Sequence, residues 1–236
     1  MRLLALDTLG PALSAALVAS GRGTAYRAAL PLDGGGQAAE RLLPLLDEIL
    51  AEAGWGWRDL DLLAVTVGPG GFTAVRTGVA TARALALALD RPAVGVGTLE
   101  AVAEAAVAAA GSGPLLALKD LRRGDVAAQA FGDDLVPEGA ARLLDRAEAL
   151  AVAAGAGRLA GDGAATIACD LPAPPSGPVV VEAAFDARYV AAAALRRVAT
   201  RGEEPVAGTS LRPFYLRAPD ARADAGRPLV TPAPPR

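Results

Sequence analysis

The chain has 236 residues, 53% of them hydrophobic and only 4% aromatic, a length that accommodates one large domain or two small ones. Its 23 Lys and Arg residues against 26 Asp and Glu give a net charge of −3. This balance argues against a nucleic-acid binder that uses its whole surface. Histidine is absent and Cys169 is the single cysteine, so the commonest general base is missing and we expect no metal site.

The cysteine count and the apolar runs bear on the compartment. One cysteine cannot form an internal disulfide framework and fits a reducing environment. We see no apolar run long enough to span a membrane, and the N-terminal "MRLLALDT" lacks the long apolar region of a signal peptide. These features predict a cytoplasmic protein with no membrane contact.

The first half of the chain reads as three strands followed by alternating helices and strands. The strands before the first helix are joined by short turns, which predicts an antiparallel meander, and Gly34–Gly36 predict a flexible joint after them. Hydrophobic periodicity then changes from the strand to the helix period. The predicted elements, in order, are strands 3–7, 12–20 and 23–30, helix 38–53, strand 60–67, helix 72–89, strand 93–97 and helix 99–110.

After "GSGP" (111–114), a plausible domain junction, the pattern partly restarts. The predicted elements there are strands 115–120 and 126–131, helix 141–154, strand 179–184 and helix 186–200. The last residues are rich in Pro and Ala, as in a loosely docked tail. We therefore predict an N-terminal subdomain 1–110, a C-terminal subdomain 111–217 and a tail 218–236.

A glycine-rich loop joins the strand at 60–67 to the helix at 72–89. Such a loop at a helix N-terminus can bind phosphate, but no Lys follows it as a Walker loop requires. Thr73 stands where a dinucleotide loop needs its third glycine. Both templates fail, and the loop is predicted to be a tight strand-to-helix turn made by Gly68, Pro69, Gly70 and Gly71, with positive φ available at Gly70 and Gly71.

The helix after the loop carries small residues every four positions, Ala74, Gly78 and Ala82. Glycine inside a helix costs about 1 kcal/mol relative to alanine, so Gly78 needs a reason, and close packing against another element supplies one. That element can belong to the same chain or to another, and spacing alone favours the same chain.

Taken together, several segments resemble the bacterial TsaB family over nearly the whole chain. They are "LLALDT" at the N-terminus, "AERLLPLLDEILAEAG" (39–54), "VGPGGFTAVRTGVATARALA" (67–86), "VGVGTLEAVA" (94–103), "DLRRGDV" (120–126), "GDGA" (161–164) and "FYLRAPDA" (214–221). Two departures lie in the most specific segment, where Gly71 replaces the family's usual Ser and Ala74 its usual Gly. The first helix opens with Gln37-Ala38-Ala39-Glu40 instead of His-Ser-Glu, so any contact made by that His is lost.

The resemblance implies an α/β fold of two ribonuclease-H-like (actin-like ATPase) subdomains, mixed sheets flanked by helices. It also implies a role as accessory subunit to TsaD in forming N6-threonylcarbamoyladenosine at position 37 of tRNAs that read ANN codons. The nucleotide loops of this superfamily look vestigial here. Their expected positions are Asp7 and Thr8, Asp120 and Arg122, and Gly161, Asp162 and Gly163. We therefore expect a pseudo-enzyme with no catalytic residues and no cofactor of its own, with ATP or ADP and metal held by partner subunits.

The partners implied by the resemblance are TsaD in a heterodimer, TsaE in a further complex, and a second copy of the chain when TsaD is absent. Any tRNA contact is expected to be indirect. In the family the first two helices make the contact, which assigns the small-residue strip to a partner. The predicted interface residues are Glu40, Leu42, Leu43, Leu46, Ile49, Leu50, Phe72, Thr73, Ala74, Arg76, Gly78, Ala82 and Arg83.

Four alternatives stay open at this point. A small-molecule kinase of the same superfamily would need intact Asp-x-Gly loops, and a peptidase would need a nucleophile beside a base. Asp7 could be a remnant metal-water ligand or could end its strand and bind the turn backbone. Arginines concentrated between 188 and 217 could face RNA.

Overall fold

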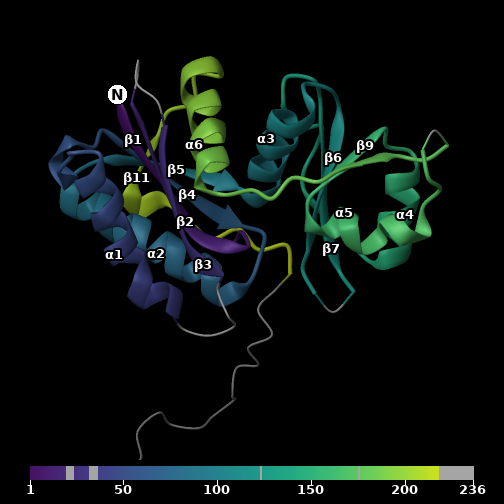
Figure 1. Ribbon diagram of the computed structural model, residues 1–236, viewed down its shortest axis with the longest axis horizontal. Coiled ribbons are helices and arrows are strands. Elements are labelled where there is room, and N and C mark those ends of the chain that lie inside the picture. The colour runs from purple at the N-terminus through teal and green to yellow at the C-terminus, as the bar shows by residue number, and fades with distance from the viewer. Residues whose placement is uncertain (20–23, 32–36, 123, 175, 218–236) are drawn as a thin grey trace, which may run out of the picture.

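The structure is a computed structural model that describes residues 1–19, 24–31, 37–122, 124–174 and 176–217. The predicted joint Gly34–Gly36 and the predicted tail 218–236 lie outside the described residues. The described chain forms two α/β units, each built on a mixed sheet (Figure 1). This confirms the predicted fold class.

The first sheet has the order β11-β5-β4-β1-β2-β3. Strands β1 to β3 form the predicted antiparallel meander, while β1, β4 and β5 run parallel. β4 is apolar and buried along almost its whole length, as expected for a strand covered on both faces. The strands are β1 (Arg2–Asp7), β2 (Ala12–Ala19), β3 (Thr24–Pro31), β4 (Leu62–Gly68), β5 (Pro92–Gly97) and β11 (Val206–Ala207).

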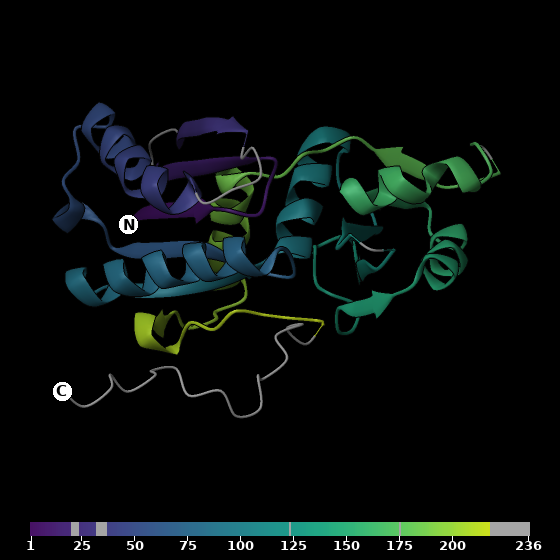
Figure 2. The same ribbon diagram turned by 90° about the horizontal axis from the view of Figure 1, so that it is seen from below.

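Helices cover both faces of this sheet (Figure 2). α1 (Gln37–Glu52) packs on β2 and β3, and α2 (Phe72–Leu89) packs on β4 and β5. On the opposite face α6 (Ala187–Leu195) packs on β1 and β2. Pro44 lies inside α1, on its exposed side.

The second sheet repeats the topology of the first in shorter form. Its order is β10-β9-β6-β7-β8. In both units the first strand therefore lies between the second and the fourth, with the third strand beyond the second and the fifth beyond the fourth. α4 (Arg146–Ala154) and α5 (Asp162–Ile167) pack on one face. This repeated order is the direct sign of two ribonuclease-H-like halves. The strands are β6 (Leu115–Asp120), β7 (Val126–Phe131), β8 (Arg142–Leu144), β9 (Arg158–Ala160) and β10 (Val179–Val181).

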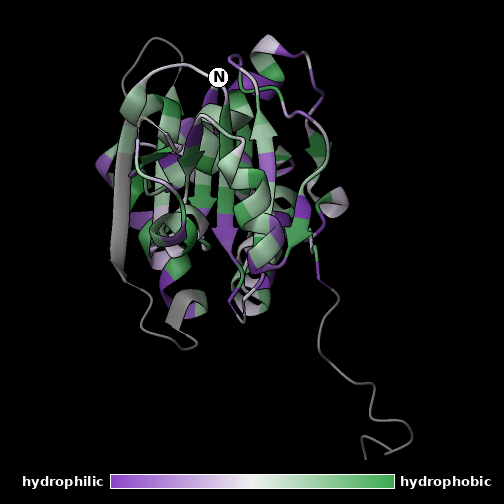
Figure 3. Ribbon diagram, turned by 90° about the vertical axis from the view of Figure 1, so that its right-hand side faces the viewer, coloured by the Kyte–Doolittle hydropathy of each residue, from purple (hydrophilic) through white to green (hydrophobic). Residues whose placement is uncertain are grey.

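Helix α3 (Thr98–Ala110) lies between the two units, against α6 on one side and β6 on the other (Figure 1). All of its residues from Thr98 to Ala106 except Glu100 are buried, which explains why the helix is largely apolar around its circumference. Hydrophobic colours predominate along the strands and helices of both units (Figure 3). Because α3 packs on both sides, the core of the first unit continues into the second.

The predicted boundary of the C-terminal subdomain is wrong in its last part. Residues 187–217 return to the first unit, where α6 covers the sheet and β11 pairs antiparallel with β5. The physical reason is that the first sheet needs a second apolar cover. Val190, Ala191 and Ala194 of α6 supply it, and the Ala187 N–H donates to the buried Ser14 hydroxyl at 3.0 Å.

Some short elements differ from their predictions. Residues 142–144 form β8 instead of the start of a helix, because Asp145 caps α4 by accepting from the Glu148 N–H at 2.8 Å. α5 was not predicted, and the last helix continues as a π-helix, η3 (Arg196–Thr200). Three short 3-10 segments were also missed: η1 (Trp57–Asp59), η2 (Ala168–Asp170) and η4 (Gly208–Ser210).

Candidate functional site

The small-residue strip of α2 faces the chain's own sheet. Gly78 and Ala82 are buried together with Val75, Val79 and Ala86. A Cβ atom added at Gly78 would lie 2.6 Å from the Thr8 hydroxyl oxygen and 3.4 Å from Val65 Cγ2. The strip therefore lets α2 approach β1 and β4 closely, and the expectation that Gly78 and Ala82 contact a partner is wrong.

The apolar residues of α1 are buried in the same way. Leu42, Leu46, Ile49 and Leu50 are at most 2% exposed and belong to the core of the first unit. They cannot reach a partner while the chain is folded, so their assignment to an interface is also wrong. Helical periodicity located an apolar stripe correctly, but such a stripe ordinarily marks the face of the helix that packs against the chain's own core.

The other predicted interface residues remain accessible. Glu40, Leu43, Thr73 and Arg76 are exposed, and Phe72, Ala74 and Arg83 are partly buried. Leu43 is 47% exposed, a large value for an apolar side chain. These residues keep their assignment as a prediction.

The outward row of α2 contains residues that the prediction omitted. Ala80, Ala84, Leu87 and Ala88 are exposed, and Leu87 is 71% exposed. With Thr73 and Arg76 they follow a spacing of three or four residues, hence one side of the helix. Arg76 carries the only charge in this row, whereas the solvent face of a surface helix is ordinarily charged. The scarcity of charge between 73 and 88 was the signal available in the sequence.

Among the described residues, α2 is the single helix that is long and apolar enough by composition to cross a membrane. One such helix is weak evidence for a membrane span, because packed helices of other proteins pass the same test. Only 28% of its residues are buried inside the chain. Much of a largely apolar helix therefore remains uncovered in the isolated chain.

The glycine loop before α2 packs against the chain itself. Gly68 has φ +114°, and a Cβ atom there would lie 2.3 Å from the carbonyl oxygen of Phe214. A Cβ atom at Gly70 would lie 2.9 Å from the Leu9 side chain. Positive φ thus falls at Gly68, while Gly71 is the helix N-cap with φ −60°. The loop is a tight turn made for close packing with Leu9 and Phe214.

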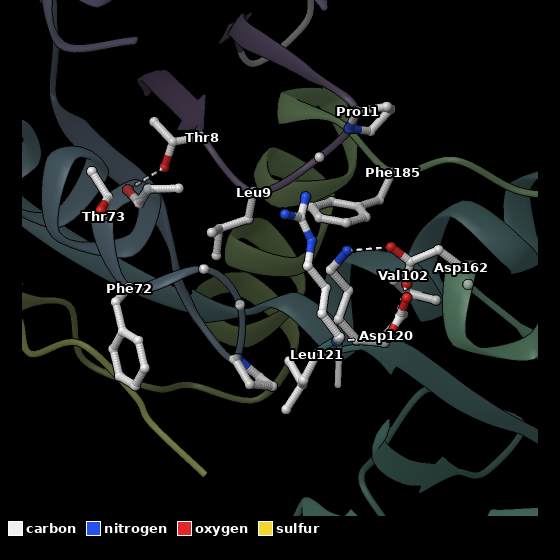
Figure 4. A pocket seen from close by; sticks show the side chains of 18 of the residues that line it. Thr8, Leu9, Pro11, Phe72, Thr73, Val102, Asp120, Leu121, Asp162 and Phe185 are labelled. Carbon is white, nitrogen blue, oxygen red and sulfur yellow. Dashed lines mark hydrogen bonds and ion pairs between the residues drawn. The ribbon is translucent and has the colours of Figure 1, made fainter. Parts of the chain in front are cut away.

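A cleft of about 890 Å³ lies between the two units (Figure 4). Of the residues predicted for a vestigial nucleotide cleft, Thr8, Asp120, Arg122, Gly161 and Asp162 line it, whereas Asp7 and Gly163 do not. The remaining walls are largely apolar. They include Leu9, Phe72, Val102, Leu121, Phe185 and Tyr215.

Asp7 is fully buried, and its carboxylate is occupied by the first turn. Its oxygens accept hydrogen bonds from the Leu9 N–H at 3.0 Å, the Gly10 N–H at 2.8 Å and the Thr66 hydroxyl at 2.6 Å. Burial raises the pKa of Asp7 above its ordinary value of 3.8, and the hydrogen bonds oppose that shift. Of the two alternatives, the structure supports the one in which Asp7 ends its strand and binds the turn.

The polar groups at the floor of the cleft bind one another. Lys119 pairs with Asp162, whose other oxygen accepts from the Asp120 N–H at 2.8 Å. A Cβ atom at Gly161 would lie 2.2 Å from the Leu118 carbonyl oxygen, and one at Gly163 would lie 2.9 Å from the same carbonyl's carbon. The glycine pair therefore lets α5 approach β6.

No group of three or more metal-binding side chains is found in the part of the chain that the structure describes.

The arginines near the C-terminal end are engaged within the chain. Arg196 pairs with the buried Glu104 through two hydrogen bonds, of 2.6 and 3.0 Å, which raise the pKa of Arg196. Arg197 binds Glu203, and Arg188 binds Asp186. These pairs balance the charges of Arg188, Arg196 and Arg197, which weakens the case for an RNA-facing surface here.

Comparisons with known proteins agree with this geometry. The family described as TsaD, tRNA N6-adenosine threonylcarbamoyltransferase, matches residues 27–210. The TsaB protein of Escherichia coli, named for tRNA threonylcarbamoyladenosine biosynthesis, is 38% identical over 126 residues, which cover 53% of each chain. The match thus spans about half the length of that relative. An uncharacterized protein of Mycobacterium tuberculosis is 32% identical over 93% of both chains.

Solved structures extend the likeness to the whole chain. YeaZ from Pseudomonas aeruginosa is 30% identical with a TM-score of 0.77, covering 91% of this chain and 99% of its own. A second structure from that organism, described as similar to the peptidase YeaZ, is 31% identical with a TM-score of 0.78, covering 92% of this chain and 99% of its own. Sequence, topology and structural likeness coincide, and the chain belongs to the bacterial TsaB family.

Proposed function

We propose that the chain is a non-catalytic scaffold subunit that binds TsaD and supports the formation of N6-threonylcarbamoyladenosine at position 37 of tRNAs that read ANN codons. The observation that carries the proposal is the outward row of α2, defined as Thr73, Arg76, Ala80, Ala84, Leu87 and Ala88. It is exposed, almost uncharged and free of bulky residues except Leu87 and Arg76. Small side chains allow a partner helix to pack at short distance.

The relatives support the same role. The names of the Escherichia coli and Haemophilus influenzae proteins place them in tRNA threonylcarbamoyladenosine biosynthesis. In this chain the cleft acid Asp162 is paired with Lys119, and Asp7 is occupied by backbone N–H groups. Both observations support a subunit that acts through contact, with ATP or ADP and metal ions on partner subunits.

The proposal also states which surface each partner would use. TsaD would take the outward row of α2 and the neighbouring exposed end of α1, including Glu40 and Leu43. A second copy of the chain would take the same surface when TsaD is absent, and TsaE would join the TsaD complex. The expected location is the cytoplasm, and tRNA would be bound mainly by the partners.

The test is an Ala84→Arg substitution at the centre of the outward row. Ala84 is exposed, so the variant should fold normally. A charge placed in the middle of an interface should weaken TsaD binding by at least about tenfold, or about 1.4 kcal/mol. Binding is measured by calorimetry with purified TsaD, and the reconstituted complex is assayed for modified adenosine.

The matched control is Ala151→Arg, the same change at an exposed position of α4 in the second unit. It should bind TsaD as the wild type does. Equal binding by Ala84→Arg and the wild type would place the interface elsewhere. Micromolar ATP binding with turnover by the isolated chain would contradict the non-catalytic assignment.

A further inference from the structure

Residues 214–217, here called the strap, cross the mouth of the cleft after the chain has returned to the first unit. Tyr215, Leu216 and Arg217 line the cleft together with residues of both units. The strap follows η4, which packs on α2. It is therefore placed to contact the partner-facing helix, the cleft and the second unit together.

The beginning of the strap is fixed to the first unit. The Phe214 N–H donates to the Val67 carbonyl at 2.7 Å, at the end of β4. The Phe214 carbonyl oxygen occupies the space that a Cβ atom at Gly68 would need. Backbone therefore packs directly on backbone at this point, which leaves little freedom for Phe214 to move.

The middle of the strap holds the first turns of α2. The rings of Tyr215 and Phe72 lie 4.9 Å apart, tilted by 46°, an arrangement that favours aromatic attraction. Arg76 Nε donates to the Tyr215 hydroxyl oxygen at 3.2 Å. Arg76 belongs to the outward row of α2, so the strap contacts the surface to which the partner is assigned.

The end of the strap reaches the second unit. Arg217 pairs with Asp125, in the turn between β6 and β7, and both side chains are about a quarter exposed at 28% and 27%. The Leu121 N–H donates to the Asp125 carbonyl at 3.0 Å, which ties that residue to the strand end. Opening the cleft would separate Arg217 from Asp125 or pull Tyr215 away from Phe72.

We propose that the strap is a latch that holds the two units together across the cleft and couples the cleft's opening to the position of Phe72 and Arg76 on the partner-facing helix. Partner binding and closure of the cleft then stabilise each other, because any coupling free energy acts equally in both directions. The statement about the partner rests on the proposed function, whereas the statement about the two units does not.

The latch is tested by charge reversal. Arg217→Asp and Asp125→Arg each place like charges together, and the double variant restores an opposite pair. Interdomain distances are measured by electron spin resonance between a label on the exposed Cys169 of the second unit and one on Ala51→Cys, an exposed position of α1. Affinity for TsaD is measured on the unlabelled proteins.

Each single reversal should broaden the distance distribution and weaken TsaD binding about two- to fivefold, the size expected for a partly exposed ion pair. The double variant should recover both quantities. The control Arg142→Asp makes the same charge change on the exposed start of β8 and should alter neither. Circular dichroism checks that every variant is folded.

Unchanged distances in both single variants would overturn the latch. Broadened distances with wild-type affinity for TsaD would overturn the coupling to the partner face. If the wild-type chain does not bind TsaD, the proposed function fails, and the distances in the isolated chain still decide whether the strap holds the two units.

Discussion

Gly78→Leu should destabilise the isolated chain by about 3 kcal/mol or more, the upper range for forcing a large side chain into a packed interior. A single Cβ atom at this position already approaches the Thr8 hydroxyl oxygen to 2.6 Å. Thr8 cannot yield freely, because its hydroxyl donates to the Ala74 carbonyl at 2.9 Å. The measurement is urea unfolding followed by circular dichroism.

Ala80→Leu is the matched control, two residues further along the same helix. Ala80 is exposed, so this variant should stay within about 0.5 kcal/mol of the wild type. Similar losses in both variants would mean that α2 is oriented differently on the sheet. Because Gly78→Leu acts on folding itself, its loss of TsaD binding would say nothing about the interface.

The first half of the fold could be predicted because its signals are local and strong. β4 is a continuous apolar run, α2 has a complete helical period, and Gly111 ends α3 with φ +77°. β8 and β10, of three residues each, are too short to show a period. The return of α6 to the first sheet is a long-range contact that no local pattern encodes.

The sequence could indicate which two helices form the candidate site, but not which side of each helix is exposed. Ala74, Gly78 and Ala82 repeat every four residues, and so do Ala80, Ala84 and Ala88. Alanine is compatible with either environment, so the side that faces the sheet depends on tertiary partners such as Thr8 and Val65. The strap was missed because its contacts join positions more than 85 residues apart, from Phe72 and Arg76 to Tyr215 and from Asp125 to Arg217.

Asp7→Ala should lower the unfolding free energy by about 3 kcal/mol. The substitution leaves the Leu9 N–H and the Thr66 hydroxyl, which the carboxylate binds at 3.0 and 2.6 Å, without their buried acceptor. Each unsatisfied buried donor costs about 1–3 kcal/mol. Asp7→Asn should lose less, because its carbonyl oxygen can still accept from both groups.

The difference in unfolding free energy between the wild type and Asp7→Asn should depend on pH with a definite sign. Burial, with a smaller contribution from the Asp186 charge, raises the pKa of Asp7 in the folded chain above its ordinary value of 3.8. Between 3.8 and the raised value the folded state therefore binds more protons than the unfolded state, and stability falls as pH rises. Above the folded pKa the contribution is constant.

Urea unfolding of the wild type and Asp7→Asn from about pH 4 to 8 measures this contribution as their difference in unfolding free energy. Subtracting the variant removes the contributions of the titratable groups that both chains share. The free energy of unfolding of the wild type, relative to that of Asp7→Asn, should fall progressively as pH rises from 3.8 to the raised pKa of Asp7. A difference that instead grows with pH would mean that the three hydrogen bonds outweigh burial. The carboxylate of Asp7 would then be held charged in the folded state, as a group fully stabilised by its turn.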